Sequence, residues 1–276
     1  MRDAHRPVGA GFLLSSQQLS DNAVGPRKVA MKLNASSISD IGLKRKSNQD
    51  YVGSFAELNL FVVADGMGGH ADGDLASRMA VQIIHGFFND DRTLLSDLSD
   101  VDRLKRAVEL ANQRIHEEGT RRAEQSRGRS LGTTVIVLKV ALETGRASWA
   151  HVGDSRLYRV RNGQLALLTA DDTLFGQEYL HKAVIPTDLP HTNQLVQALG
   201  VNERVDVSVA SDTVTSGDLF LLCSDGVSGQ LGAMAIEKEL AAGDDLERTG
   251  QALIRLSLEA GGRDNASAVL VRVSDG

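Results

Sequence analysis

The sequence has a single cysteine, Cys223, and only four prolines among its 276 residues. One cysteine excludes an intrachain disulfide and a cysteine-based zinc site, and it is typical of a protein in a reducing compartment. No apolar run approaches the roughly 20 residues that span a bilayer. We therefore expect a cytoplasmic protein without a membrane segment, and the scarcity of proline argues against a proline-rich linker between domains.

The sequence also lacks positive charge in excess. Its formal net charge is -6, which gives no general attraction to nucleic acid or to anionic membranes. The densest basic stretch, EGTRRAEQSRGRS at 118–130, is short and contains no aromatic residue. We interpret it as a solvated helix end and loop, and we expect no nucleic-acid partner.

What the sequence does contain is apolar material for a sizeable core, at 42% of residues. The N-terminal stretch has a mixed-charge start and no convincing cleavage site, so it is a poor signal peptide.

Two regions are expected along the chain. We expect residues 1–34 to be a loosely ordered extension. Residues 35–275 are expected to form a single catalytic domain, with a flap, a segment beside the site, near 171–200.

Short runs rich in Val, Leu and Ile predict many strands, several of them close enough in sequence to be joined as hairpins. One such connection carries an Asn162–Gly163 turn. Helical periodicity predicts helices over 74–88, 102–118 and 246–260. Strands do not alternate regularly with helices, which favours an α+β fold of antiparallel sheets covered by helices. The predicted strands are 60–65, 133–140, 146–152, 156–160, 165–170, 206–210, 218–224 and 266–273.

Acidic residues recur where these strands begin or end. Strand ends from neighbouring strands lie close together, so these carboxylates can converge on one rim of a sheet. Converging carboxylates repel one another, and a hard divalent cation such as Mg²⁺ or Mn²⁺ relieves that repulsion. A glycine beside one of them, Gly66, lets a backbone carbonyl approach as a further ligand. The acids are Asp50, Asp65, Asp154, Asp225 and Asp264.

Each of these features has a plainer interpretation. An Asp-Gly pair after a strand is commonly only a turn. The glycine-rich stretch at 66–73 can be a strand-to-helix corner, with Asp72 or Asp74 capping the next helix. No GxxxxGK[ST] nucleotide loop and no HExxH zinc motif is present. Cys223 lies inside an apolar strand, where a core role is favoured over a nucleophile.

The order of these features along the chain, and their occurrence together, favour the functional interpretation. Six segments resemble, in register, the motifs of the metal-dependent serine/threonine protein phosphatases of type 2C, in their bacterial form. The most distinctive is VADGMGGH at 63–70, and the resemblance covers about residues 36–273. The other segments are RKSNQD at 45–50, LGTT at 131–134, HVGDSRLY at 151–158, LLCSDGV at 221–227 and GGRDNAS at 261–267.

This resemblance implies a central antiparallel β-sandwich flanked by helices in four α-β-β-α layers, with a two-metal site that holds Mn²⁺ or Mg²⁺. It implies that Asp65 bridges both metals, that the Gly66 carbonyl binds the second, and that Asp225 and Asp264 bind the first. Asp154 matches the acid that holds a third, weaker metal. Arg45 matches the arginine that grips the substrate phosphate. One strand within SDIGLKRKSNQD is expected to deliver Arg45 and Asp50.

The sequence also departs from the family pattern. Where the family has Asn-Glu-Asp, this chain has Asn48-Gln49-Asp50. A neutral Gln49 supplies no charge to the second metal, so Asp50 must supply the negative charge there, directly or through water. In the flap, Asp-His-Ser reads Asp171-Asp172-Thr173, and Gln197 stands in place of an arginine. These changes weaken any inference about substrate.

The implied activity is hydrolysis of phosphoserine and phosphothreonine by a metal-activated water, with Asp65, Asp225 and Asp264 as the catalytic acids. The implied partners are phosphoproteins, expected to be substrates of a separately encoded serine/threonine kinase. The alternative is a catalytically silent, phosphatase-like module that binds phosphorylated regulatory partners, which Gln49 and the altered flap motivate.

Overall fold

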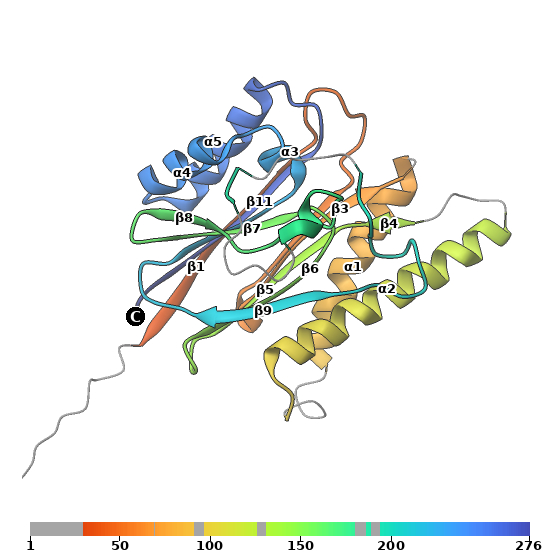
Figure 1. The fold of residues 1–276 in the computed structure, drawn as a ribbon, viewed down its shortest axis with the longest axis horizontal. Coiled ribbons are helices and arrows are strands. Elements are labelled where there is room, and N and C mark those ends of the chain that lie inside the picture. The colour runs from red at the N-terminus through yellow and green to blue at the C-terminus, as the bar shows by residue number, and fades with distance from the viewer. Residues whose placement is uncertain (1–29, 69, 91–96, 126–130, 180–185, 189–193) are drawn as a thin grey trace, which may run out of the picture.

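The computed structural model describes residues 30–68, 70–90, 97–125, 131–179, 186–188 and 194–276. Its strands form two antiparallel sheets (Figure 1). The first sheet has the order β1 (Met31–Asp40), β11 (Ala266–Asp275), β10 (Leu219–Cys223), β7 (Arg156–Arg161) and β8 (Gln164–Leu167). The second has the order β2 (Asp50–Phe55), β3 (Leu60–Met67), β5 (Val135–Ala141), β6 (Arg146–Val152) and β9 (Ser208–Thr213), with β4 (Gly132–Thr133) pairing with β3.

The two sheets pack face to face because their central strands are apolar on both sides. In β3, Phe61 and Val63 face the layer between the sheets, whereas Leu60 and Val62 face the helices. Because side chains alternate along a strand, β3 contributes to two cores, one between the sheets and one beneath the helices. The core between the sheets also receives Trp149 from the second sheet. The expected four-layer sandwich is confirmed.

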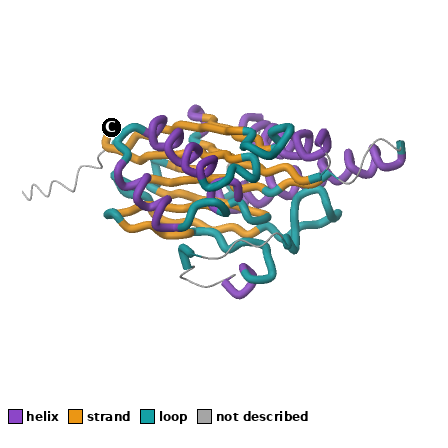
Figure 2. Tube along the Cα trace, turned by 90° about the horizontal axis from the view of Figure 1, so that it is seen from above, coloured by secondary structure: helices purple, strands orange, loops and turns teal. Residues whose placement is uncertain are grey.

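Helices cover both outer faces, as Figures 1 and 2 show. Helices α1 (His70–Asp90) and α2 (Asp100–Glu124) pack on the second sheet. Helices α4 (Ala233–Ala242) and α5 (Leu246–Glu259) and the one-turn α3 (Asp225–Ser228) pack on the first. The three predicted helices are confirmed, whereas α4 was not predicted. Two 3₁₀ turns, Ala56–Leu58 and Gly176–Tyr179, complete the regular elements among the described residues.

Two local signals in the sequence set the limits of elements, and one of them, the Asn162–Gly163 turn, was predicted. Helix α2 begins after Ser99, whose side chain accepts a hydrogen bond from the Asp102 backbone N–H. The β7–β8 hairpin turns at Asn162 and Gly163, with φ angles of 53° and 76°. Two consecutive positive φ angles match the tight turn that an Asn-Gly pair predicts. None of the helices in the described part of the chain combines the length and apolar character needed to cross a bilayer.

The N-terminal region differs from the sequence-based expectation. Strand β1 already begins at Met31, so residues 31–34 belong to the sheet and not to a loose extension. Every residue of β1 pairs with β11, from Met31 opposite Asp275 to Asp40 opposite Ala266. A long-range partner therefore fixes a segment whose own pattern is weak. Residues 1–29 lie outside the described residues, as do residues 126–130 of the basic stretch.

The strand expected within SDIGLKRKSNQD was also wrong. β1 ends at Asp40, and residues 41–49 form a loop that leads to β2. The loop turns at Gly42, where φ is +78° and a Cβ atom would lie 2.2 Å from the carbonyl oxygen of Asp264. Only glycine accommodates both the backbone angle and this close approach. Arg45 therefore lies on a loop, and Asp50 begins β2.

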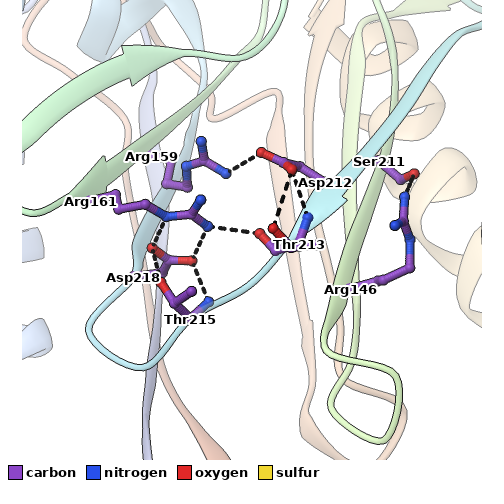
Figure 3. Close-up of polar contacts among 8 residues, drawn as sticks. All are labelled: Arg146, Arg159, Arg161, Ser211, Asp212, Thr213, Thr215 and Asp218. Carbon is purple, nitrogen blue, oxygen red and sulfur yellow. Dashed lines mark hydrogen bonds and ion pairs between the residues drawn. The ribbon is translucent and has the colours of Figure 1, made fainter.

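A polar network joins the two sheets at the end of β7 that is remote from residues 153–155. Arg159 of β7 forms an ion pair with Asp212 of β9 at 2.8 Å. Arg161 donates to both carboxylate oxygens of Asp218, at 2.7 and 2.6 Å, and to the carbonyl oxygen of Thr213 at 2.7 Å. Figure 3 shows these contacts running from β7 across to β9.

Candidate active site

Strand pairing brings the first two acidic residues together. Asp50 at the start of β2 is the register partner of Asp65 near the end of β3. Asp65 is held by its backbone: its N–H donates to Thr134 Oγ1 at 3.1 Å, and its carbonyl oxygen accepts from Thr133 Oγ1 at 2.9 Å. The predicted Gly-Thr-Thr segment thus fixes the position of Asp65 through β4 and the residue that follows it.

The other sheet contributes Asp225 and Asp264. Asp225 follows β10, and Asp264 precedes β11. Because β10 and β11 are antiparallel neighbours, both residues lie at the same end of the first sheet. Asp154 lies in the short connection between β6 and β7, where Ser155 shares a hydrogen bond of 2.7 Å with Thr134. Acids from both sheets thus converge at one end of the sandwich.

These residues line one cavity of about 840 Å³. Six of the seven predicted site residues contribute to its lining, which confirms that the fold brings them together. The seventh, Asp50, is 5% exposed, and its Oδ2 accepts a hydrogen bond from Ser224 Oγ at 2.7 Å. The six lining residues are Arg45, Asp65, Gly66, Asp154, Asp225 and Asp264. Another cavity, of about 750 Å³, lies between α2 and residues 203–205 and is lined by none of them.

Gly66 allows the backbone to approach closely at this site. A Cβ atom on Gly66 would lie 2.1 Å from the carbonyl oxygen of Gly73 in the first turn of α1. Any larger residue would separate α1 from β3. The glycine-rich stretch is therefore a strand-to-helix corner, and that corner is also part of the cavity wall.

Burial and mutual repulsion raise the pKa of four carboxyl groups in this cluster, those of Asp50, Asp65, Asp154 and Asp225. Desolvation is the main cause in each case, because ionised carboxylates lose their hydration inside the protein. Desolvation, reinforced by the charges of Asp50 and Asp225, raises the pKa of Asp65 well above its usual range. Desolvation and then the charge of Asp225 raise the pKa of Asp154 to about 7. The pKa values of Asp50 and Asp225 are raised as well.

One arginine compensates part of the negative charge of this cluster. Arg45 Nη2 forms an ion pair with Asp264 Oδ2. Within the described ranges, no three carboxylate, thiolate or imidazole groups surround a single point closely enough to hold a metal ion as they stand.

The donor set nevertheless fits a hard divalent cation. Asp50 Oδ1 and Asp225 Oδ1 are buried and have no hydrogen-bond partner among the described residues. A buried carboxylate oxygen without a partner is costly, and a cation would satisfy it. All the available ligands are oxygen atoms, which suit Mg²⁺ or Mn²⁺. The site therefore has both unsatisfied acceptors and excess negative charge.

Gln49 is the neutral member of this site. It is 7% exposed and lines the cavity, yet its Nε2 is buried without a partner among the described residues. Its backbone is well held, because its N–H donates to Asn265 Oδ1 at 2.8 Å and its carbonyl oxygen accepts from the Gly66 N–H at 3.1 Å.

Sequence reasoning missed the role of Asn265. This residue is 3% exposed, and its Nδ2 donates to the carbonyl oxygens of Ile41 and Ser47 at 2.8 and 3.0 Å. It thereby fixes the loop that carries Arg45. The available signal was its place beside Asp264 in GGRDNAS, but a single polar residue in that segment does not reveal which loop it binds.

A second missed feature joins the flap to the loop that carries Asp154. Arg156, 2% exposed, donates Nε and Nη2 to the two carboxylate oxygens of Asp171 at 2.9 and 2.7 Å. Gly153 donates its N–H to Asp172 Oδ2 at 2.8 Å and accepts from the Asp172 N–H at 2.9 Å. His151 shares a 2.8 Å hydrogen bond with the carbonyl oxygen of Ala170. The altered flap sequence Asp171-Asp172 therefore has a structural role: it holds the start of the flap against the segment that carries Asp154.

Cys223 has the core role that the sequence favoured. The side chain is fully buried in the cluster between the first sheet and its helices. Burial raises the pKa of the thiol to about 12. A thiol that stays protonated and inaccessible is not a nucleophile at neutral pH.

Comparison with known proteins gives a consistent result. The model of the protein phosphatase 2C family matches residues 44–272. The chain is 31% identical over 245 residues to protein phosphatase PhpP of Streptococcus pneumoniae, an alignment that covers 86% of this chain and 96% of that protein.

Solved structures agree with the sequence comparison. The catalytic domain of the serine/threonine protein phosphatase PstP, in complex with two manganese ions, matches with a TM-score of 0.75 at 29% identity, over 89% of this chain and 100% of that one. PppA, a regulatory component of the type VI secretion system in Pseudomonas aeruginosa, matches with a TM-score of 0.74 at 32% identity, over 88% and 98% of the two chains.

Proposed function

Because the chain belongs to the protein phosphatase 2C family, we propose that its aspartate cluster is the metal centre at which phosphoserine and phosphothreonine are hydrolysed. The chain is a metal-dependent serine/threonine protein phosphatase that acts on phosphoproteins. The observation that carries the proposal is the convergence of Asp65 and Asp225, from opposite sheets, on one cavity with unsatisfied carboxylate oxygens.

We assign the ligands residue by residue. Asp65 would serve both of two Mn²⁺ or Mg²⁺ ions, the Gly66 carbonyl oxygen would bind the second, and Asp225 and Asp264 would bind the first. Asp50 would serve the second ion, directly or through water, and Asp154 would serve a third, weaker ion. Bound cations supply Lewis-acid activation of a water molecule and stabilise charge on the phosphate oxygens. PstP with two manganese ions supports two as the basic number.

The residues of the chain prepare this site for cations and phosphate. Burial raises the pKa of Asp154 to about 7 and that of Asp225 to about 6, so a cation would displace protons from these two groups near neutral pH. Arg45 lies at the cavity with its side chain 48% exposed. Its planar guanidinium suits the oxygens of a phosphate, which would compete with Asp264 for it.

The substrates in this proposal are phosphoproteins of a separately encoded serine/threonine kinase in the cytoplasm. The family assignment supports a protein substrate, and the open cavity supports a phosphorylated side chain as the group that enters it. Its volume of about 840 Å³ lies within the range typical of ligand sites.

Neutralising either central acid is expected to abolish turnover while leaving the fold intact. Asp65→Asn and Asp225→Asn each remove a cation ligand, and we expect a loss of at least about 10³-fold in kcat with Mn²⁺. The measurement is hydrolysis of para-nitrophenyl phosphate and of a phosphothreonine peptide, with EDTA, Mg²⁺ and Mn²⁺ in parallel. Circular dichroism checks the fold.

Asp244→Asn is the matched control, since Asp244 is exposed and does not line the cavity. It should retain full activity. Mn²⁺-dependent turnover by Asp65→Asn would disprove the assignment of Asp65 as the bridging ligand. A folded wild-type protein that binds Mn²⁺ but hydrolyses neither substrate would instead favour the silent module that binds phosphorylated partners.

A further inference from the structure

The cavity has an apolar wall as well as acidic residues. Leu174, Leu195 and Val196 line it together with Asp154 and Asp225. We call these three residues the apolar wall. Leu174 is 60% exposed and Val196 is 39% exposed. Phe175, next to Leu174, is 57% exposed.

The apolar wall is fixed in position by backbone contacts. Thr173 and Leu195 form an antiparallel bridge, and the Val196 N–H donates to the carbonyl oxygen of Asp172 at 2.8 Å. Asp172 in turn exchanges two hydrogen bonds with Gly153, one residue before Asp154. The two flap segments thus present their apolar side chains at a fixed place relative to the metal centre.

This exposure differs from that of other surface hydrophobic residues. Met234 is 85% exposed on α4 and lines none of the described cavities. An isolated exposed side chain of that kind needs no explanation. The apolar wall, by contrast, is continuous with a cavity that a phosphoprotein must enter. Whatever segment delivers its phosphate there places its neighbouring residues against these side chains.

We propose that the apolar wall receives a large apolar side chain next to the phosphorylated residue, so that the enzyme prefers phosphosites flanked by residues such as Leu, Ile or Phe. This inference rests on the proposed function, because it requires the phosphate to bind at the aspartate cluster. An apolar neighbour is removed from water on the wall, which favours binding. An acidic neighbour gains nothing there and loses hydration.

Three phosphothreonine peptides test this preference. They are identical except for Leu, Ser or Glu on both sides of the phosphothreonine, and kcat/KM is measured with Mn²⁺. One apolar group in a pocket discriminates by about 10-fold or more, and a partly exposed wall should give about 5- to 10-fold for Leu over Ser. Glu should be hydrolysed no better than Ser.

Variants then locate the preference. Leu174→Ser combined with Val196→Ser should reduce the Leu-to-Ser ratio to about 2 or less, mainly through a higher KM for the Leu peptide. Leu174→Met keeps an apolar side chain and should retain the ratio. Met234→Ser is the matched control on a remote exposed hydrophobic residue and should retain it as well.

The outcomes separate this inference from the proposed function. Wild-type enzyme that hydrolyses para-nitrophenyl phosphate and all three peptides alike would overturn the apolar wall as a binding surface and leave the metal centre standing. A double variant that keeps the full Leu-to-Ser ratio of kcat/KM would also overturn the apolar wall as a binding surface. Failure to hydrolyse any phosphoester would overturn the proposed function and this inference with it.

Discussion

At the scale of single residues, the site gathers several carboxylates whose negative charge needs compensation. Asp50 and Asp65 are register partners, and Asp225 and Asp264 approach from the other sheet. Arg45 forms an ion pair with Asp264 and compensates part of this charge. Gln49 is a buried side chain at the cavity that adds no charge, and its Nε2 has no partner among the described residues.

Gln49→Glu is expected to tighten Mn²⁺ binding. A further carboxylate adds an anionic ligand or a strong hydrogen-bond acceptor near the second ion, and changes of this kind alter metal affinity by about 10- to 100-fold. Isothermal titration calorimetry measures the dissociation constant. The same substitution should lower the melting temperature in EDTA, because it adds a buried charge to a repelling cluster.

The matched control for this change is Gln164→Glu, on an exposed position of the β7–β8 hairpin. It adds the same charge to the protein without adding it to the cavity, and Mn²⁺ affinity should stay close to that of the wild type. An unchanged dissociation constant for Gln49→Glu would show that position 49 does not contribute to the cation site.

At the scale of elements, contacts between β7, β9 and the following loop join the sheets. Arg161 holds Asp218, which is fully buried, whereas Asp212 in the ion pair with Arg159 is 45% exposed. Asp218 also accepts from the Thr215 backbone N–H at 2.9 Å. The two ion pairs lie side by side in Figure 3.

Asp218→Ala should destabilise the fold by about 3 kcal/mol, because it leaves Arg161 and the Thr215 N–H without a buried acceptor. Asp212→Ala should cost only about 0–1 kcal/mol, since the Asp212 side chain is 45% exposed to water. Urea unfolding of the Mn²⁺-loaded variants measures both free energies. Equal changes in the free energy of unfolding would contradict the view that the Asp218 contact stabilises the fold more because it is buried.

At the scale of the whole molecule, the metal centre couples stability to pH. The site joins strand ends from both sheets, so its charge state acts on the packing of the sandwich. In the metal-free protein, the pKa of Asp154 is raised to about 7, and those of Asp50 and Asp225 are raised as well, mainly by desolvation.

These raised pKa values set the sign of the pH dependence. Between the unfolded pKa near 4 and the folded values, the native state binds more protons than the unfolded state. The stabilisation from these groups is therefore present at about pH 4 and is lost as pH rises through about 7. Mn²⁺ replaces the protons, so its stabilising effect should grow over the same range.

Thermal unfolding in EDTA and in excess Mn²⁺, at about pH 5.5 and about pH 8, measures this coupling. We expect the increase in melting temperature caused by Mn²⁺ to be several degrees larger at the higher pH. An increase that is the same at both pH values would show that cation binding does not displace protons from the cluster.

The sequence by itself determined the fold class, three helices, most strands and the acidic residues of the site. These features depend on short-range patterns: apolar periodicity in 74–88, the Asn162–Gly163 turn, and Asp65 following an apolar run. Such signals survive in a single sequence because neighbouring residues carry them.

Only the tertiary structure decided the features that depend on distant partners. β1 exists because it pairs along its whole length with β11, more than 200 residues later, so its own weak pattern predicted a loose extension. The loop that carries Arg45 is fixed by Asn265, and the flap by Arg156 with Asp171. Local sequence does not encode which remote group satisfies a buried polar atom, because that choice is made when the two sheets pack together.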